Sequence, residues 1–513
     1  MSDIFISYAR EDHTKTKVLA EALEQKGFTV WWDPKIVAGA QFDQVIKREL
    51  DAAKCIVVLW SKASVKSRWV KDEANIGADR DILVPAVIQD VDIPMGHRQI
   101  QAARLIDWDG RLNHPMLKQL FKAITATVKG LDHPLESGIK LSSVKDIQTT
   151  PIKNQGRTHT HWSFAIISFI EAELLRMGKA PTNLSEMFIV RKTYPKKATQ
   201  YIRLNGKMAF SADGLAGDAL QVLRKHGLVP ESVYSGKPDG ESQYNNVEMD
   251  AMLKAALDSI LTNQESELSK TWPRAIDGIL DAYLGRVPES FSFDGNSYTA
   301  KSFVEKLPFD PDDYIQLTSY SHHPFYTTFS LEIEENWASN KYLNVPLNEF
   351  MAVMDHALEN GYSLVWHGDI TDKSFSLKKG VAIHPLKNWE DRTQLEKDRI
   401  CEVSEPEKQV TQELRQDVFD SLKFAHNHHL HIVGVAYDEN GKRYYKAKDS
   451  RGLKDSRYNG FVYMSESYIQ AKTFSIMVHK EALLNKIVEQ LQGKEKESIG
   501  ETWFFEALKE KKR

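Results

Sequence analysis

The chain up to about residue 125 alternates between short apolar runs and segments whose apolar residues recur at helical spacing. This pattern predicts strands at 3–9, 28–32, 55–60 and 82–88 and near 105–108, and helices at 13–25, at 42–53 and around residue 73. Pro34 and Gly39 interrupt the stretch 33–42, which predicts a loop. Strands and helices that alternate in this way form a sheet covered on both faces. We therefore expect an α/β unit built on a flavodoxin-like, doubly wound parallel sheet.

The segment 67–73, SRWVKDE, follows the apolar strand that ends at Trp60. Ser67 can cap a helix, and the spacing of four between Trp69 and Glu73 places indole and carboxylate on one helical face. Ligands of parallel α/β sheets bind beyond the carboxyl ends of the strands. Glu73 is therefore a candidate site residue, although a solvated helix carboxylate is the simpler alternative.

Chain length, net charge and cysteine count limit the class of protein. A chain of 513 residues predicts two or three domains, and 67 basic against 71 acidic residues leave a net charge of −4, which indicates neither nucleic acid nor a membrane as partner. No run approaches the roughly 18 apolar residues of a membrane span, and the start of the chain lacks a signal-peptide pattern. Two cysteines, Cys55 and Cys401, exclude a disulfide framework and fit a reducing compartment. We expect a cytoplasmic location.

Four segments carry a resemblance to a known family, namely DIFISYAREDH, GFTVWWD, CIVVLWSKASVKSRWVKDEA and IPMGHRQIQ. In this order they resemble a TIR domain of the bacterial type, which we assign to residues 1–128. TIR domains are either adaptors or enzymes that cleave NAD, and in the enzymes the glutamate of a WxxxE pattern is catalytic. The resemblance implies that Glu73 is catalytic and that NAD is bound by Tyr8, Ala9, Arg10, Trp32, Asp33 and Trp69. Core aromatics and loop charges remain the alternative interpretation of these binding residues.

The helical pattern is lost in residues 129–142, which contain two glycines and a proline and predict a linker. Beyond it, a polar stretch leads to an apolar helix that begins near His161. Residues 428–452 predict two strands joined by an Asp-Glu-Asn-Gly hairpin turn. Residues 235–320 predict helical and loop decoration, and residues 486–513 a helical tail.

The segments KDIQTTPIKNQGRTHTHWSFAIISFIEAELLRMG, GLAGDALQVLRKHGLVPESVY and HHLHIVGVAYDENGKRYYKAKDSRG resemble a papain-like cysteine peptidase of the bleomycin hydrolase and aminopeptidase C branch. The resemblance implies an α+β domain, which we assign to residues 143–485. The resemblance implies that Gln155 is the glutamine that donates to the oxyanion. It places the histidine that activates the nucleophile at His428, or at His429 if the alignment shifts by one, and it places Asp449 at the position of the family's asparagine. The nucleophile position holds His161, and neither cysteine lies at a matching place. We therefore expect a pseudo-peptidase.

Two histidines and a carboxylate are also a recurring metal-ligand set. His161, His428 and Asp449 could form one, with further ligands from His159, His426, His429 and His431. The simpler interpretation is a run of histidines on strand and loop surfaces, and we predict no metal site.

Together these features predict an NAD-cleaving effector with NAD as its substrate and no cofactor. The resemblance implies activation by self-association through the loop 33–42 and a role in bacterial defence against phage. The pseudo-peptidase cleft would bind a peptide or protein trigger. Two alternatives remain: a TIR adaptor without enzymatic activity, and a live peptidase that uses another nucleophile such as Cys401.

Overall fold

The computed structural model describes residues 2–32, 42–80, 82–94, 102–111, 114–128, 138–237, 243–262, 267–424, 426–453 and 456–495. By their internal contacts the residues separate into two compact units, 1–136 and 137–513. We describe each unit by itself. No helix in the described ranges is long and apolar enough to span a bilayer.

The first unit is built on a parallel sheet of five strands in the order β2-β1-β3-β4-β5. Its strands are β1 (Ile4–Ser7), β2 (Val30–Trp31), β3 (Cys55–Trp60), β4 (Leu83–Val87) and β5 (Ala103–Arg104). This order is that of a flavodoxin-like sheet, so the predicted doubly wound fold is confirmed. The last strand lies just ahead of the predicted 105–108.

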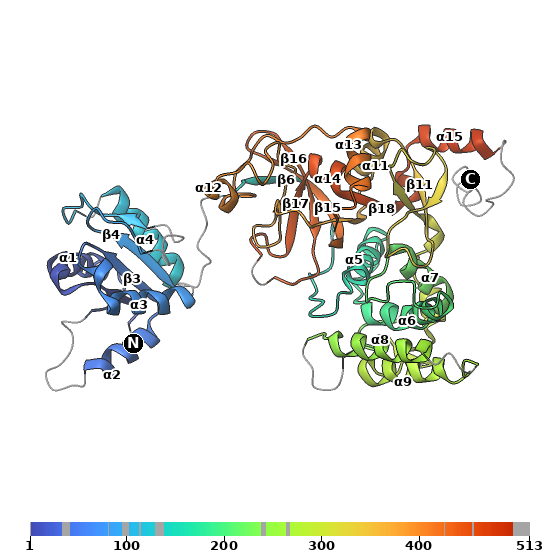
Figure 1. Ribbon diagram of the computed structural model, residues 1–513, viewed down its shortest axis with the longest axis horizontal. Coiled ribbons are helices and arrows are strands. Elements are labelled where there is room, and N and C mark those ends of the chain that lie inside the picture. The colour runs from blue at the N-terminus through green and yellow to red at the C-terminus, as the bar shows by residue number, and fades with distance from the viewer. Residues whose placement is uncertain are drawn as a thin grey trace. The chain divides into compact units, whose positions relative to one another are not determined.

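Two helices cover each face of this sheet (Figure 1). The helices are α1 (His13–Glu24), α2 (Phe42–Ala52), α3 (Arg68–Asp79) and α4 (Pro115–Val128). Apolar residues of α1 and α4 pack against one face of the sheet, and those of α2 and α3 against the other. The all-apolar strand β3 is completely buried between these layers, as a central parallel strand requires.

The second unit combines a helical part with a large mixed sheet (Figure 1). Its helices are α5 (His161–Arg176), α6 (Glu186–Arg203), α7 (Ala216–His226), α8 (Val247–Thr262), α9 (Trp272–Leu284), α10 (Ala300–Val304), α11 (Leu347–Glu359), α12 (Gln394–Asp398), α13 (Gln412–Asp420), α14 (Glu466–Lys472) and α15 (Asn485–Glu495). Helices α5 to α9 share one apolar core, so the stretch 235–320 adds helices that pack on the helical part.

The sheet of this unit runs β10-β11-β9-β18-β12-β15-β16-β17-β14-β13, with β6 paired to β15. Its strands are β6 (Leu141–Asp146), β9 (Tyr314–Thr318), β10 (Thr328–Ser330), β11 (Lys341–Asn344), β12 (Leu364–Asp369), β13 (Phe375–Ser376), β14 (Val381–Ala382), β15 (Asn427–Asp438), β16 (Arg443–Lys448), β17 (Phe461–Ser465) and β18 (Thr473–His479). A separate hairpin consists of β7 (Phe291–Phe293) and β8 (Asn296–Tyr298). The antiparallel pairing of β15 with β16 confirms the predicted hairpin.

Both ends of the predicted peptidase-like domain connect to this sheet and its core. Strand β6 begins within the stretch predicted as linker and pairs with the central strand β15. On α15, Ile487 and Leu491 are buried in the sheet's apolar core, which shows that the start of the predicted tail is docked.

Candidate functional site

Glu73 lies on α3 and is held by a neighbour one helical turn before it. Ser67 caps the helix, its Oγ accepting a hydrogen bond from the Val70 amide at 3.3 Å. The indole Nε1–H of Trp69 donates to Glu73 Oε1 at 2.6 Å. The carboxylate is buried, with 6% of the residue exposed, whereas Trp69 is 50% exposed. The predicted helix start and the shared face are therefore confirmed, and Glu73 is not a solvated surface charge.

Glu73 and Trp69 line a cavity of about 580 Å³ at the carboxyl end of β1. The cavity is also lined by Phe5, Ile6, Ser7, Tyr8, Ala9, Arg10, Glu11, Trp31, Ile46, Ala63, Lys66, Ser67 and Val70. It thus brings together Tyr8, Ala9 and Arg10 from the segment after β1 with the α3 pair. Its volume suits a small organic ligand.

The second strand contributes a different tryptophan from the one predicted. Trp32 is buried in the core, where its ring lies 6.0 Å from Tyr8 and 5.2 Å from His13, and it does not line the cavity. Trp31 lines it and stacks on Phe5 at 4.9 Å. Successive side chains of a strand point to opposite faces, so the exchange of neighbours follows from the strand's register. Asp33 lies outside the described residues.

A buried hydrogen bond joins the segments that follow β1 and β3. Ser61 Oγ donates to Asp12 Oδ2 at 2.5 Å, and Ser61 Oγ also accepts from the Ser64 amide. Burial raises the pKa of Asp12, although the hydrogen bond from Ser61 opposes the shift. The two residues are 49 positions apart, so no local pattern predicted their contact.

In the second unit, His161 occupies the first position of α5 and is held by two partners. Its Nδ1 accepts a hydrogen bond from the His429 backbone amide at 3.3 Å, and its Nε2 lies 3.3 Å from Asp213 Oδ1. An Nδ1 that accepts leaves the ring proton on Nε2, directed at Asp213. Burial alone would raise the pKa of Asp213, but the bond to His161 together with the nearby charges of His161 and Lys197 outweighs it, and the net shift is downward. Sequence analysis missed Asp213, which lies 52 residues after His161.

His428 and Asp449 form a second hydrogen-bonded pair beside His161 and Asp213. His428 Nε2 donates to Asp449 Oδ1 at 2.7 Å, and the His428 ring centroid lies 4.6 Å from that of His161. Burial and the nearby His161 lower the pKa of His428 to about 4, despite the opposing effect of Asp449. Burial disfavours the Asp449 carboxylate, but its bond to His428 and the charges of His428 and Arg451 together outweigh this and lower its pKa. A neutral imidazole therefore faces an ionised carboxylate. Of the two candidate histidines, His428 and His429, it is His428 that pairs with Asp449.

Gln155 lies next to this pair and has a fixed amide orientation. Ser450 Oγ donates to Gln155 Oε1 at 2.7 Å, and the Gln155 amide donates to the Ser450 carbonyl at 2.8 Å. Because the side-chain oxygen is engaged, the side-chain nitrogen is the group left to donate to a ligand.

Two further histidines extend the buried cluster. The ring of His429 stacks on His161 at 5.5 Å and on His367 of β12 at 4.1 Å. In the described part of the chain, the ligand atoms of His161, His428 and Asp449 do not converge within 4.8 Å of one another.

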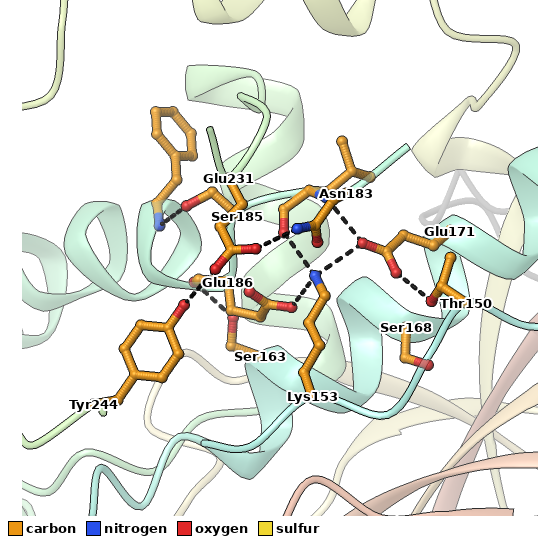
Figure 2. A network of polar contacts seen from close by, with 12 residues as sticks. Thr150, Lys153, Ser163, Ser168, Glu171, Asn183, Ser185, Glu186, Glu231 and Tyr244 are labelled. Atoms are coloured by element: carbon orange, nitrogen blue, oxygen red, sulfur yellow. Dashed lines mark hydrogen bonds and ion pairs between the residues drawn. The ribbon is translucent and has the colours of Figure 1, made fainter. Parts of the chain in front are cut away.

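The polar network of Figure 2 ties the segment before Gln155 to helices α5 and α6. Lys153 Nζ lies 3.0 Å from Glu171 Oε1 and 2.6 Å from Glu186 Oε1. Burial disfavours the charge of Lys153, but the two carboxylates outweigh it and raise the pKa of the ammonium. Burial raises the pKa of Glu186 to about 7 against the effect of Lys153. The network therefore holds the Gln155 segment against the helix that carries His161.

Neither cysteine lies at this centre. Cys55 lies in β3 of the first unit, and burial raises the pKa of its thiol. Cys401 is buried, donates to the Ser374 carbonyl at 3.0 Å, and has its pKa raised to about 12 mainly by burial. Such thiols are poor nucleophiles.

Comparison with known proteins gives two family matches. A family model described as "TIR domain" matches residues 4–120, and one described as "Peptidase C1-like family" matches residues 210–503. A search of curated proteins gives no match.

Among solved structures, PepW from Lactobacillus rhamnosis HN001 is 16% identical with a TM-score of 0.53, and the match covers 80% of this chain and 97% of that one. The TIR domain of the Toll-related receptor TRR-2 from Hydra magnipapillata is 20% identical over 24% of this chain and 99% of that one, with a TM-score of 0.22. Xylellain, a cysteine protease from Xylella fastidiosa, is 14% identical over 66% and 87%, with a TM-score of 0.33. The likeness to PepW supports the predicted papain-like α+β fold.

Proposed function

The chain belongs to the Peptidase C1-like family and carries a TIR domain ahead of that part, and on this premise we propose that it is an NAD-cleaving effector regulated by a catalytically inactive peptidase-like unit. The observation that carries the proposal is the buried carboxylate of Glu73, which lines a cavity of about 580 Å³ and is oriented by the Trp69 indole.

Glu73 suits the chemistry of this reaction. Breaking the bond between ribose and nicotinamide builds positive charge on the ribose, and a fixed carboxylate beside the sugar stabilises that charge as it develops. The Trp69 bond keeps the carboxylate in one position, so little reorganisation is needed during the reaction. Tyr8, Ala9 and Arg10 line the same cavity and contact the nucleotide.

The second unit is proposed to lack peptidase activity because the nucleophile position holds His161. The partner histidine and its carboxylate, His428 and Asp449, are in place, but an imidazole forms only an unstable acyl species. The ring of His161 lies against that of His428, so a second imidazole stands beside His428. This unit binds a peptide or protein trigger and controls assembly of the TIR domains, in a setting of bacterial defence against phage.

The test is an assay of NAD loss and nicotinamide release by the full chain, with and without a crowding agent. We expect Glu73→Gln to reduce turnover by about a hundredfold or more, on the order of 3 kcal/mol. Asp72→Asn is the matched control, because Asp72 neighbours Glu73 on α3 but its side chain is 64% exposed. Wild-type turnover in Glu73→Gln would exclude Glu73 as the catalytic residue. No turnover by the wild-type chain in any assembled state would replace the proposal by a TIR adaptor.

A separate experiment tests the inactive peptidase. We expect no peptide hydrolysis by the wild type, and we expect His161→Cys to react with a cysteine-directed alkylating agent faster than either native cysteine. The exchanged thiol stands at a helix N-terminus beside His428, which favours the thiolate. Peptide hydrolysis by the wild-type chain would refute this part of the proposal.

A further inference from the structure

Three metal-binding side chains meet on the surface of the second unit, outside the sites described above. His322 and His323 lie in the turn after β9, and Glu332 follows β10. In the described part of the chain, this is the group whose ligand atoms all lie within 4.8 Å of one another. His322 Nε2 lies 3.1 Å from Glu332 Oε2, and His323 Nε2 lies 2.7 Å from Oε1.

We propose that His322, His323 and Glu332 bind a divalent transition-metal ion of the zinc or iron class. Two imidazoles with one carboxylate form a ligand set that such ions favour, with positions left open for water or substrate. Ligand atoms about 2.1 Å from a tetrahedral ion lie roughly 3.4 Å apart. The nitrogen–oxygen distances of 3.1 Å for His322 and 2.7 Å for His323 would therefore lengthen by about 0.3 Å and about 0.7 Å when an ion binds.

Aromatic packing holds both rings in place before any ion arrives. The His323 ring stacks on Phe329 with centroids 4.0 Å apart and planes at 24°. The His322 ring lies parallel to Phe419 of α13, at 5.6 Å and 15°. Asn344 Nδ2 donates to the His323 carbonyl at 2.9 Å and fixes the backbone of the turn. Little side-chain freedom is therefore lost on binding, and this favours affinity.

Gln416 supplies the outer hydrogen bond that metal-binding histidines usually have. Its Oε1 accepts from the Ser321 amide at 2.7 Å, which sets the orientation of the side-chain amide. His322 Nδ1 then lies 3.0 Å from Gln416 Nε2 and 3.3 Å from Oε1. Gln416 can therefore stabilise either tautomer of His322, including the one with its lone pair on Nε2, where the ion binds.

The site lies at the surface, with 29%, 33% and 55% of the side chains of His322, His323 and Glu332 exposed. An ion can enter directly from solvent and keep bound water. Once bound, it cross-links the turn after β9 to the end of β10 and, through Gln416, to α13.

The experiment uses the tag-free full chain after removal of metals with a chelator. Zn²⁺ is titrated in competition with a chromophoric chelator, and Co²⁺ provides the visible absorption of a bound ion. We expect about one equivalent of Zn²⁺ and a rise in melting temperature. Glu332→Gln and His323→Ala should lose both, and Gln416→Ala should weaken binding by about tenfold or more. His426→Ala is the matched control, because His426 is exposed elsewhere on the unit and should leave binding unchanged.

Two results would overturn the assignment. One is the absence of saturable Zn²⁺ binding by the wild type, which would leave only histidine–glutamate ion pairs. The other is an equivalent of Zn²⁺ retained by Glu332→Gln and by the double variant His322→Ala/His323→Ala. Circular dichroism of the metal-free variants checks folding, and the exposed Glu332→Gln provides the test if loss of His323 disturbs its packing on Phe329.

Discussion

Replacing His367 by phenylalanine should change how the stability of the second unit depends on pH. The residue is 2% exposed, and within the described residues neither ring nitrogen has a hydrogen-bond partner. Its ring stacks on His429 and lies with its centroid 5.2 Å from that of Phe474. Burial, reinforced by His161 and His428 against the opposing charge of Asp213, lowers its pKa from 6.5 to about 3. His367→Phe keeps an aromatic ring and removes this titrating group.

The sign follows from proton binding. Between about pH 3 and pH 6.5 the unfolded histidine is protonated while the folded one is neutral, so its contribution to stability is present above pH 6.5 and is lost as the pH falls. At pH 5.5, one unit below the unfolded value, the loss is about 1.4 kcal/mol. Burial raises the pKa of Glu186 to about 7 and of Asp250 to about 6, and these carboxyls act in the opposite direction. The decisive quantity is therefore the difference between variant and wild type.

Amide hydrogen exchange of β12 and β15 in the full chain measures this difference. When the pH falls from about 7.5 to about 5.5, we expect the unfolding free energy to drop by about 1.4 kcal/mol less in the variant than in the wild type. The exchange rate, corrected for its intrinsic pH dependence, should therefore rise about tenfold less in the variant. His426→Gln, at an exposed histidine, should follow the wild type. Equal losses in His367→Phe and wild type would refute the argument that His367 is neutral in the folded state.

Three further results follow from single contacts. Trp69→Phe removes the N–H that donates to Glu73 and should lower NAD turnover by about tenfold without loss of folding, and unchanged nicotinamide release would contradict its positioning role. Lys153→Met leaves two buried carboxylates without their cation and should cost about 3 kcal/mol in urea denaturation, so wild-type stability would show that the network contributes little. Cys401 should resist iodoacetamide in the native protein and react after denaturation, because burial raises its pKa to about 12; rapid native labelling would support a peptidase using that thiol.

Local spacing was enough to predict several features of the fold and site. The helix start at Ser67, the shared face of Trp69 and Glu73, and the start of α5 at His161 all depend on residues within one or two turns of each other. The hairpin of β15 and β16 depends on a short turn between two alternating segments. Such interactions act over a few residues and are visible in the order of side chains alone.

The amino-acid sequence by itself therefore determined which segments form helices and strands, the parallel sheet of the first unit, and the position of Glu73 on the helix that follows β3. Tertiary structure decided which neighbour faces the cavity, Trp31 instead of Trp32, because that depends on strand register. It also brought Asp213 to His161 and placed His367 opposite His429. These contacts join residues tens of positions apart, and only the packing of helices and the pairing of distant strands bring them together.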